Sequence, residues 1–529
     1  MPIATVNPAD GRTVEVFDPL DEAGVEARLA RAQSAFESWR LSTFAQRSEL
    51  MHRAAELLEQ TNDEIARTMT LEMGKPLAQA RAEAAKCAKA MHWYADRAEE
   101  LLADEHPAKE DVEDSGGVSA FVRYRPLGPV LAVMPWNFPF WQVIRFAAPA
   151  LMAGNVGLLK HASNVPRTAL ALEELFARAG FPQGCFQTLL IPSRAVEALI
   201  RDERIAAVTL TGSEGAGRAV ARVAGDEVKK TVLELGGSDP FLVLPSADVP
   251  AAVARAVTAR VQNNGQSCIA AKRFIVHTAV YDEFLSGFTA RMRALTVGDP
   301  MADATEVGPL ATEQGRTDLE ELVTDAVGLG AGVACGGRRP DAPALANGWY
   351  YLPTVLTDVT PRMRIHREEA FGPLATVYRA GDLDEAVAIA NDTPFGLSSN
   401  VWTRDDGDRE RCVRDLRAGG VFFNGMTASH PAFPFGGIKR SGYGRELSGH
   451  ATPLCSHNPP VWPGSCAPAG PPPGPAAAPR AGRRGRPLRR RAGRVDAGGR
   501  ARGGPRTGRR RPPRSRPTPP RTRSAARAA

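Results

Sequence analysis

The feature that most constrains the fold of this chain is the alternation of strand-like and helix-like segments between residues 155 and 235. Short apolar runs alternate there with longer stretches whose apolar residues recur at helical spacing. The expected strands are 155–160, 186–191, 206–210 and 231–235, and the expected helices are 167–179, 194–201 and 215–224. Repeated units of this kind predict an α/β fold with a doubly wound, largely parallel sheet, which binds ligands at the carboxyl ends of its strands.

A second α/β pattern runs from about residue 241 to 432. Its expected strands are 241–244, 273–277, 374–378 and 421–423, and its expected helices are 250–262, 280–295, 314–329 and 382–391. Ahead of both patterns, residues 23–39 and 44–103 have the apolar spacing of long helices. Two lobes of similar size are therefore predicted, and a cleft between lobes is a common place for an active site.

The C-terminal end differs sharply in composition from the rest of the chain. Residues 451–529 contain 19 Arg, no Lys, one Asp and no Glu, with 17 of the 43 prolines and one aromatic residue, Trp462. The net charge of +7 therefore belongs to this tail, and residues 1–450 are net acidic. Such a tail cannot bury enough apolar surface to offset the entropy lost on ordering, so we expect it to be disordered.

Several classes of protein are excluded by the rest of the composition. No apolar stretch reaches the ~18 residues that a membrane-spanning helix requires. The N-terminal residues lack the basic and apolar regions of a secretory signal. The seven cysteines are scattered, without a CxxC pair or zinc-like spacing, as is typical of reduced thiols. We therefore expect a cytoplasmic protein without a bound metal or a membrane partner.

Six segments occur in the order in which the aldehyde dehydrogenase superfamily has them. They are PWNFP (135–139), LTGSEGAG (210–217), ELGGSDP (234–240), NNGQSCIAAKR (263–273), EEAFGP (368–373) and PFGGIKRSGYGRE (434–446). The chain resembles this superfamily over roughly residues 5–450. The strings at 134–155, 158–166 and 265–274 are most similar to bacterial NADP-dependent succinate-semialdehyde dehydrogenases. The resemblance implies an aldehyde dehydrogenase-like fold with a Rossmann-like cofactor lobe, an α/β catalytic lobe and a small oligomerisation sheet.

By this resemblance Cys268 is the nucleophile, which converts a planar aldehyde into a tetrahedral adduct that can expel hydride. A lone cysteine is more often a small buried hydrophobe, but the GQSC context matches the family's active-site segment. Glu234, followed by Gly236 and Gly237, matches the general base that hydrolyses the thioester; without the motif it would be an ordinary strand-end carboxylate. Asn137 matches the oxyanion-binding residue, although an Asn between prolines is otherwise a routine turn former.

The expected cofactor turn departs from the usual GxGxxG fingerprint. Gly212 and Gly217 are five residues apart, which alone is weak evidence for nucleotide binding. The family nevertheless uses this turn, including Ser213, to approach the dinucleotide phosphates at the start of a helix. Lys160 and Ser163 match the positions near the adenosine ribose. Because members strict for NAD often carry Glu at the second of these positions, Ser163 favours NADP, with NAD as a possible substitute.

Further residues are assigned by the same resemblance. Glu369 and Phe371 match the residues that hold the nicotinamide ribose and ring, and Trp136 is expected to line the cofactor cleft.

The prediction of the substrate-binding residues depends mainly on one arginine. Arg145 follows PWNFP on an expected helix, where a guanidinium can pair bidentately with a substrate carboxylate. A salt bridge at the surface or between the lobes is the alternative for this residue. Phe435 is expected to pack against the aldehyde chain, and Lys439 and Arg440 are an alternative carboxylate anchor.

The resemblance also divides the chain into regions. Residues 1–117 and 135–240 are expected to form the cofactor-binding domain, 241–432 the catalytic domain, and 118–134 with 433–450 the bridging region through which family members form homo-oligomers.

After His450 the sequence departs from the family's pattern. The final strand of the bridging region is therefore expected to be missing, and assembly to be impaired. We interpret 451–529 as the product of a reading-frame shift, with a nucleic-acid-binding arm as the less favoured alternative.

The resulting functional prediction is oxidation of succinate semialdehyde, or a similar carboxylated aldehyde, to the acid with NADP or NAD through a cysteine thiohemiacetal and thioester. This is the chemistry of γ-aminobutyrate degradation in the group that the chain resembles. Another substrate such as glutarate semialdehyde stays open, because a pocket discriminates one methylene by only ~1–3 kcal/mol. A CoA-acylating enzyme would usually lack the base, so Glu234 argues against that class.

Overall fold

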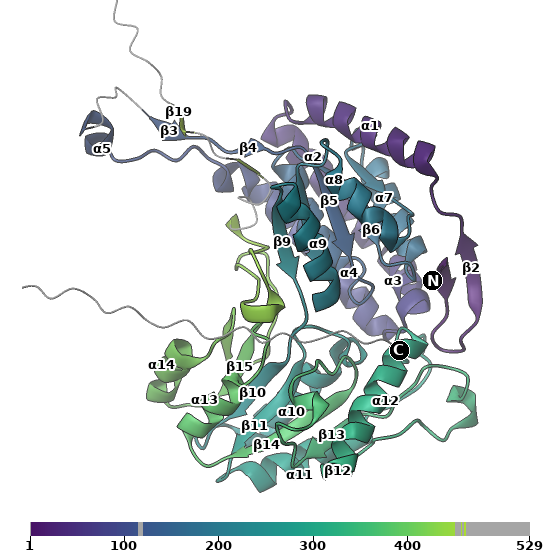
Figure 1. Cartoon of the computed structure of the whole chain (residues 1–529), viewed down its shortest axis with the longest axis vertical. Helices are drawn as coiled ribbons and strands as arrows, with labels where there is room; N and C mark the ends of the chain where they lie inside the picture. The colour runs from purple at the N-terminus through teal and green to yellow at the C-terminus, as the bar shows by residue number, and fades with distance from the viewer. Residues whose placement is uncertain (1, 115–119, 450–455, 458–459, 462–529) are drawn as a thin grey trace, which may run out of the picture. The chain divides into compact units, whose positions relative to one another are not determined.

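The computed structural model describes residues 2–114, 120–449, 456–457 and 460–461 (Figure 1). These residues all belong to one compact unit of the chain. The tail 451–529, which we expect to be disordered, lies outside the described residues except for 456–457 and 460–461.

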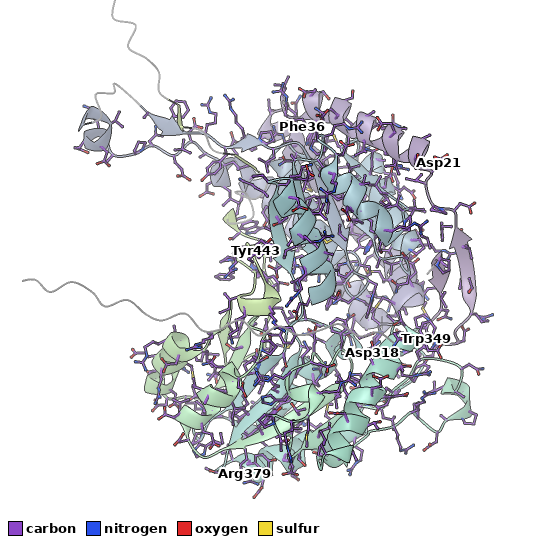
Figure 2. The ribbon with its side chains drawn as sticks, viewed as in Figure 1. Asp21, Phe36, Asp318, Trp349, Arg379 and Tyr443 are labelled. Carbon is purple, nitrogen blue, oxygen red and sulfur yellow. The ribbon has the colours of Figure 1, made fainter. Side chains whose placement is uncertain are left out.

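The N-terminal part is a hairpin followed by four long helices. They are β1 (Ile3–Val6), β2 (Thr13–Phe17), α1 (Glu22–Trp39), α2 (Phe44–Gln60), α3 (Asn62–Met73) and α4 (Leu77–Leu101). Asp21 begins α1 by accepting a hydrogen bond from the backbone N–H of Gly24 (Figure 2). The region expected to be helical over 44–103 is divided before Leu77, because Gly74 ends α3 in the left-handed conformation and Pro76 precedes α4.

The first large sheet has the strand order β17-β9-β8-β5-β6-β7. Its strands are β5 (Pro129–Met134), β6 (Val156–His161), β7 (Phe186–Thr188), β8 (Ala207–Thr211), β9 (Lys230–Glu234) and β17 (Gly442–Tyr443). All neighbours are parallel except β17, which is antiparallel to β9. The helices of this lobe are α6 (Trp141–Met152), α7 (Pro166–Arg178), α8 (Val196–Arg201) and α9 (Glu214–Asp226). The predicted doubly wound pattern is confirmed here.

One boundary prediction is wrong. Residues 129–134 were expected in the bridging region, but they form β5, which lies between β6 and β8. The apolar run Val130, Leu131 and Ala132 is fully buried, as is usual for a central parallel strand covered on both faces.

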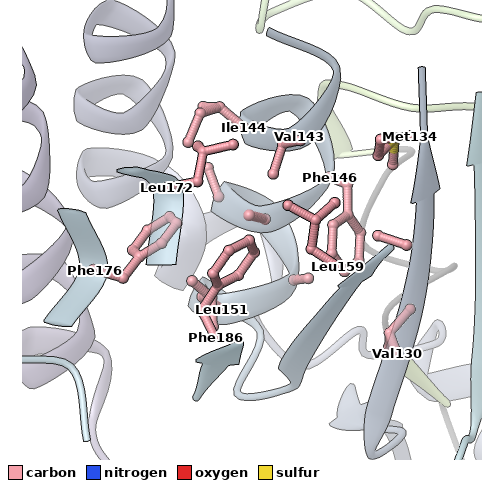
Figure 3. Packing of buried hydrophobic residues seen from close by; sticks show 14 of the residues in the cluster. Val130, Met134, Val143, Ile144, Phe146, Leu151, Leu159, Leu172, Phe176 and Phe186 are labelled. Atoms are coloured by element: carbon pink, nitrogen blue, oxygen red, sulfur yellow. The ribbon is translucent and has the colours of Figure 1, made fainter. Parts of the chain in front are cut away.

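The core of this lobe is built around α6, whose twelve residues are all buried. Figure 3 shows Val143, Ile144, Phe146 and Leu151 of this helix packing among strand and helix residues such as Leu159. A helix buried on every side must also bury its one charged side chain, Arg145, and a buried charge needs a partner.

The second sheet has the order β12-β13-β14-β11-β10-β15-β16. Its strands are β10 (Asp239–Val243), β11 (Ala271–His277), β12 (Gly332–Cys335), β13 (Thr354–Thr357), β14 (Leu374–Ala380), β15 (Ser399–Trp402) and β16 (Val421–Phe423). Its helices are α10 (Val249–Val261), α11 (Tyr281–Ala294), α12 (Glu313–Gly328), α13 (Leu383–Asn391) and α14 (Asp406–Asp415). The sequence pattern missed α14, because Cys412 is its single buried residue and no apolar periodicity results.

The bridging region is paired differently from the expectation. Its elements are α5 (Lys109–Asp114), β3 (Phe121–Val122), β4 (Arg125–Pro126), β18 (Ser456–His457) and β19 (Pro460–Val461). The final strand was expected to be missing, yet β18 pairs with β4 and β19 pairs with β3, both antiparallel. Strand pairing uses backbone N–H and C=O groups, so a segment of unrelated sequence can complete an open edge.

Among the residues that the structure describes, no helix is long and apolar enough to cross a membrane.

Candidate active site

The loop that carries Cys268 is fixed by an unusual backbone and by buried amides. Asn263, Asn264 and Gly265, in the short 3-10 turn Gln262–Gly265 before Cys268, all have left-handed φ angles, of 57°, 58° and 72°. The side-chain amide of Asn264 donates to the carbonyls of Gly74 and Pro309, each at 2.8 Å. Such strained conformations persist where the surroundings over-determine them, which is typical of functional sites.

Asn137 lies beside this loop. Its Nδ2 donates to the Gln266 carbonyl at 3.1 Å, and its own carbonyl accepts from Asn263 Nδ2 at 2.7 Å. The structure therefore brings the PWNFP and GQSC segments together, as the resemblance implies.

His161 was not singled out in the sequence but positions the Asn137 segment. Its ring lies 2.9 Å (Nε2) from the Pro139 carbonyl, and its Nδ1 accepts from the backbone N–H of Ala162, also at 2.9 Å. Burial lowers the pKa of His161 to about 4, so the ring is neutral and one nitrogen can accept while the other donates. Its position at the end of β6, next to the strand that leads into PWNFP, is the feature of the sequence that could have identified it.

Glu234 is the last residue of β9, where it pairs with Gly442 of β17. The Tyr443 hydroxyl (Figure 2) lies 2.7 Å from Thr231 Oγ1 and strengthens this strand pair. The Glu234 side chain is 2% exposed, and neither of its oxygens has a hydrogen-bond partner among the described residues. Burial raises the pKa of Glu234 well above its usual range, Arg145 lowers it, and Glu446 raises it further. The protonated form of this carboxyl group is thus favoured more than in an exposed glutamate.

The Cys268 thiol is also electrostatically tuned. Burial raises the pKa of Cys268 to about 12, while the positive charges of Lys272 and Arg145 lower it. Lys272 Nζ donates to the carbonyls of Ser267 and Cys268, each at 2.8 Å, and pairs with Glu369 Oε1 at 3.0 Å. Further positive charge, or removal of the proton by a base, is needed to make this sulfur a thiolate.

The expected nicotinamide residues converge on the same place. Glu369 Oε1 accepts from the backbone N–H of Gly237 at 3.0 Å, next to the ELGG segment. Phe371 contacts Trp136 edge-on, with ring centroids 5.7 Å apart and an interplanar angle of 82°. Four of the six segments that carry the resemblance therefore meet around Cys268.

The glycine turn after β8 has clear structural roles. Ser213 is the N-cap of α9, and its Oγ accepts from the Ala216 N–H at 3.3 Å. A Cβ on Gly217 would lie 2.6 Å from a methyl group of Leu235, so only glycine lets α9 pack this closely. Gly212 donates its N–H to the Glu234 carbonyl at 3.0 Å.

Lys160 opens onto a cavity of about 260 Å³ between β6, β8 and α9. Its Nζ donates to the His161 carbonyl at 2.8 Å, and burial lowers the pKa of Lys160 to about 8. Arg194 and Arg222 line the same cavity and were missed, although Arg194 soon follows the carboxyl end of β7. Glu197 also lines the cavity, 4.0 Å from Arg222, so three basic side chains face one carboxylate there, an excess of positive charge that suits a phosphate. Ser163 contacts the N-terminal strand, since its carbonyl accepts from the Ala4 N–H at 3.0 Å.

Arg145 pairs with a carboxylate of the chain itself, which is the salt-bridge alternative to binding a substrate carboxylate. It forms an ion pair with Glu446, and both residues are 2% exposed. Its Nη2 lies 3.3 Å from Thr211 Oγ1, and its guanidinium lies 4.7 Å from the centre of the Phe435 ring. The positive charge of Arg145 lowers the pKa of both Cys268 and Glu234, and its guanidinium packs against Phe435, the residue expected beside the aldehyde chain.

The second proposed anchor is not supported. Lys439 Nζ donates to the carbonyls of Asn391 and Thr393, at 3.2 and 3.4 Å, and Arg440 lies 3.6 Å from Glu214. Both cations are engaged away from Cys268, because the Lys439–Ser441 turn packs against neighbouring loop and helix ends.

Comparison with known proteins identifies the family. Residues 1–456 match the aldehyde dehydrogenase family. The chain is 60% identical over 466 residues to the succinate-semialdehyde dehydrogenase [NADP(+)] of Mycobacterium avium (strain 104), which covers 88% of this chain and 97% of that protein. It is 61% identical over 450 residues to succinate-semialdehyde dehydrogenase [NADP(+)] 1 of Mycobacterium tuberculosis (strain ATCC 25618 / H37Rv), covering 85% and 97% respectively.

A solved structure agrees with these sequence relatives. The succinic semialdehyde dehydrogenase of Streptococcus pyogenes, in complex with NADP+ as the cofactor, has a TM-score of 0.84 and 33% identity, covering 87% of this chain and all of that chain. The fold class and the enzyme class expected from the sequence are confirmed. With these matches and with the family's segments gathered around Cys268, the chain belongs to the aldehyde dehydrogenase family.

Proposed function

We propose that the chain oxidises succinate semialdehyde, or a closely similar short carboxylated aldehyde, to the acid with NADP. The observation that carries this proposal is the 60% identity to a mycobacterial succinate-semialdehyde dehydrogenase [NADP(+)], together with the contacts that bring Asn137 to the loop of Cys268. The names of the similar mycobacterial enzymes support the same substrate.

In the proposed mechanism the Glu234 carboxylate takes the proton of the Cys268 thiol and passes it to solvent, and the sulfur attacks the aldehyde carbon. The Asn137 amide and the backbone N–H of Cys268 hold the developing oxyanion, each worth about 3–4 kcal/mol of barrier. Glu369, Phe371 and Trp136 would hold the nicotinamide end of NADP, which would supply the acceptor for the hydride of the thiohemiacetal. Glu234 then takes a proton from the water that attacks the thioester, and Cys268 is released with the acid. Because burial raises the pKa of Glu234, its base form depends on the positive charge of Arg145 beside it.

The cofactor preference is proposed from charge. Lys160, Arg194 and Arg222 line one cavity with the carboxylate of Glu197, which lies 4.0 Å from Arg222, so a 2′-phosphate there would meet more basic than acidic groups. Ser163 adds no carboxylate that would repel that phosphate. Glu369, Phe371 and Trp136 would hold the nicotinamide end, and the Gly212–Ser213–Gly217 turn would approach the pyrophosphate.

The remaining proposals concern assembly and location. We propose a homo-oligomer formed through the bridging region, a cytoplasmic location supported by the free cysteines of the described residues, and a frame-shift origin for residues 451–529. Light scattering on the purified chain tests the assembly, and the intact mass of the protein from its host tests the tail.

Steady-state kinetics test the proposed reaction. Succinate semialdehyde, glutarate semialdehyde and butanal would each be assayed with NADP and NAD, with Cys268→Ala as the control that should bind NADP but turn over no aldehyde. The expected result is the highest kcat/KM for succinate semialdehyde with NADP. A higher kcat/KM for butanal would overturn the proposed substrate class, and activity in the Cys268→Ala variant would overturn the mechanism.

A further inference from the structure

A second cation contacts the helix that carries Arg145, from a helix that carries none of the family's motifs. Lys86 of α4 is half-buried, and its Nζ donates to Ser429 Oγ at 2.7 Å. The same hydroxyl accepts from Trp141 Nε1 at 3.1 Å, and the ammonium lies 4.0 Å from the centre of the Trp141 ring. Trp141 and Arg145 are one turn apart on α6. The aromatic ring that contacts Lys86 and the other cation, Arg145, therefore lie on the same helix.

The surroundings of Ser429 connect Lys86 to the reacting groups. Ser429 lines a cavity of about 350 Å³ together with Phe435 and Gly436. The Phe435 ring packs against the Arg145 guanidinium, and a Cβ on Gly436 would lie 2.8 Å from Glu234 Oε1. The cavity therefore shares a wall with the proposed base and with Arg145.

The two cations differ in how far they are neutralised. Arg145 is already paired with Glu446. Lys86 has no carboxylate within 4.0 Å among the described residues. The acidic group nearest to it in chain order, Glu83, is paired with Lys75 and accepts the N–H groups of Phe140 and Trp141 at the start of α6. A half-buried ammonium held by a hydroxyl and an aromatic face has donors left for an incoming anion.

We propose that Lys86, held by Ser429 and Trp141, binds the carboxylate of the aldehyde substrate and thereby sets the preference of the enzyme for carboxylated aldehydes. This inference rests on the proposed function and extends it, because it names the group that recognises the substrate's charge. Ser429 would turn its hydroxyl proton toward the same carboxylate, since it already accepts two hydrogen bonds.

Electrostatics support the assignment. Burial lowers the pKa of Lys86 to about 8, Cys87, Glu83 and Cys268 raise it, and Arg145 lowers it. The ammonium is therefore within electrostatic range of the nucleophile. Its charge is lost as the pH rises through 8, whereas a bound carboxylate would favour the charged form.

The test compares Lys86→Met with Lys86→Arg and with Lys89→Met, which removes an exposed charge from the same helix. Lys86→Met should raise KM for succinate semialdehyde roughly ten- to a hundredfold, the range for a lost hydrogen bond to a charged group, and leave butanal nearly unchanged. Lys86→Arg should stay closer to the wild type in this preference, and Lys89→Met should match the wild type. Equal losses with both aldehydes in Lys86→Met would assign Lys86 a structural role and overturn the inference.

A second measurement needs no variant. In the wild type, KM for succinate semialdehyde should rise as the pH passes 8, while KM for butanal, which shares the Cys268 chemistry, should not follow it. Parallel pH profiles for the two aldehydes would overturn the inference. If the wild type prefers succinate semialdehyde and Lys86→Met keeps that preference, only this inference fails. If the wild type shows no preference for carboxylated aldehydes, the proposed function fails with it.

Discussion

Replacing Arg145 by Met should destabilise the protein far more than the loss of an ordinary arginine. Arg145 and Glu446 are each 2% exposed, and Glu446 keeps only the hydroxyl of Thr209, 3.2 Å from its Oε1, as a side-chain donor after the change. Removing one partner of a buried ion pair costs about 3–5 kcal/mol, because the other charge is left without compensation. With an unfolding entropy of about 2.1 cal/mol/K per residue, a compact unit that spans residues 1–465 shifts by about 1 °C per kcal/mol, so the apparent Tm should fall by about 3–5 °C.

Differential scanning calorimetry at one scan rate and one protein concentration measures this fall. The matched control is Arg67→Ala, which breaks the exposed pair of Arg67 and Asp63, whose side chains are both 54% exposed, and should cost only ~0.3–0.5 kcal/mol. The double variant Arg145→Met with Glu446→Gln removes both charges, keeps an acceptor for Thr209, and should recover most of the loss. A Tm shift no larger than that of the control, or a double variant less stable than the single one, would refute the reasoning.

Two further predictions concern the chemistry and the cofactor. Glu234→Gln should release about one NADPH per active site in a burst and then turn over slowly, since acylation proceeds while deacylation lacks its base; rapid-quench kinetics check this. Because burial raises the pKa of Glu234, the fraction of Glu234 in the base form grows as the pH rises, and wild-type deacylation should speed up with it. A Glu234→Gln variant with the same pH profile would argue against the assignment. Ser163→Glu should weaken NADP binding much more than NAD binding through repulsion of the 2′-phosphate, as measured by titration of each cofactor, and equal effects would show that Ser163 does not face that phosphate.

Four strands of each large sheet could be predicted from the sequence because their signals are local. Each strand–helix unit carries its own apolar run, turn and helical spacing, as in 155–160 followed by 167–179. The prediction failed where no local signal exists. The strand β17 is two residues long, and β18 and β19 pair through their backbones, which leave no side-chain pattern to recognise.

The residues of the site also differ in whether a local signal in the sequence identifies them. Cys268, Glu234 and Asn137 could be proposed because each lies within a segment that resembles a family motif. The pairing of Arg145 with Glu446 could not, because sequence gives the charges but not which of them meet inside the fold. Lys86 was missed for a related reason, since a lysine on a long amphipathic helix usually lies on the solvated face.

The pairing of β17 with β9 also bears on when the enzyme can become active during synthesis. The strand that ends in Glu234 is made long before Gly442 and Tyr443, so one of its edges stays open while the whole second lobe is translated. Glu446, the partner of Arg145, leaves the ribosome later still. A nascent chain can therefore complete the parallel strands of its first sheet while the free edge of β9 and the buried charge of Arg145 still await partners from residues 442–446.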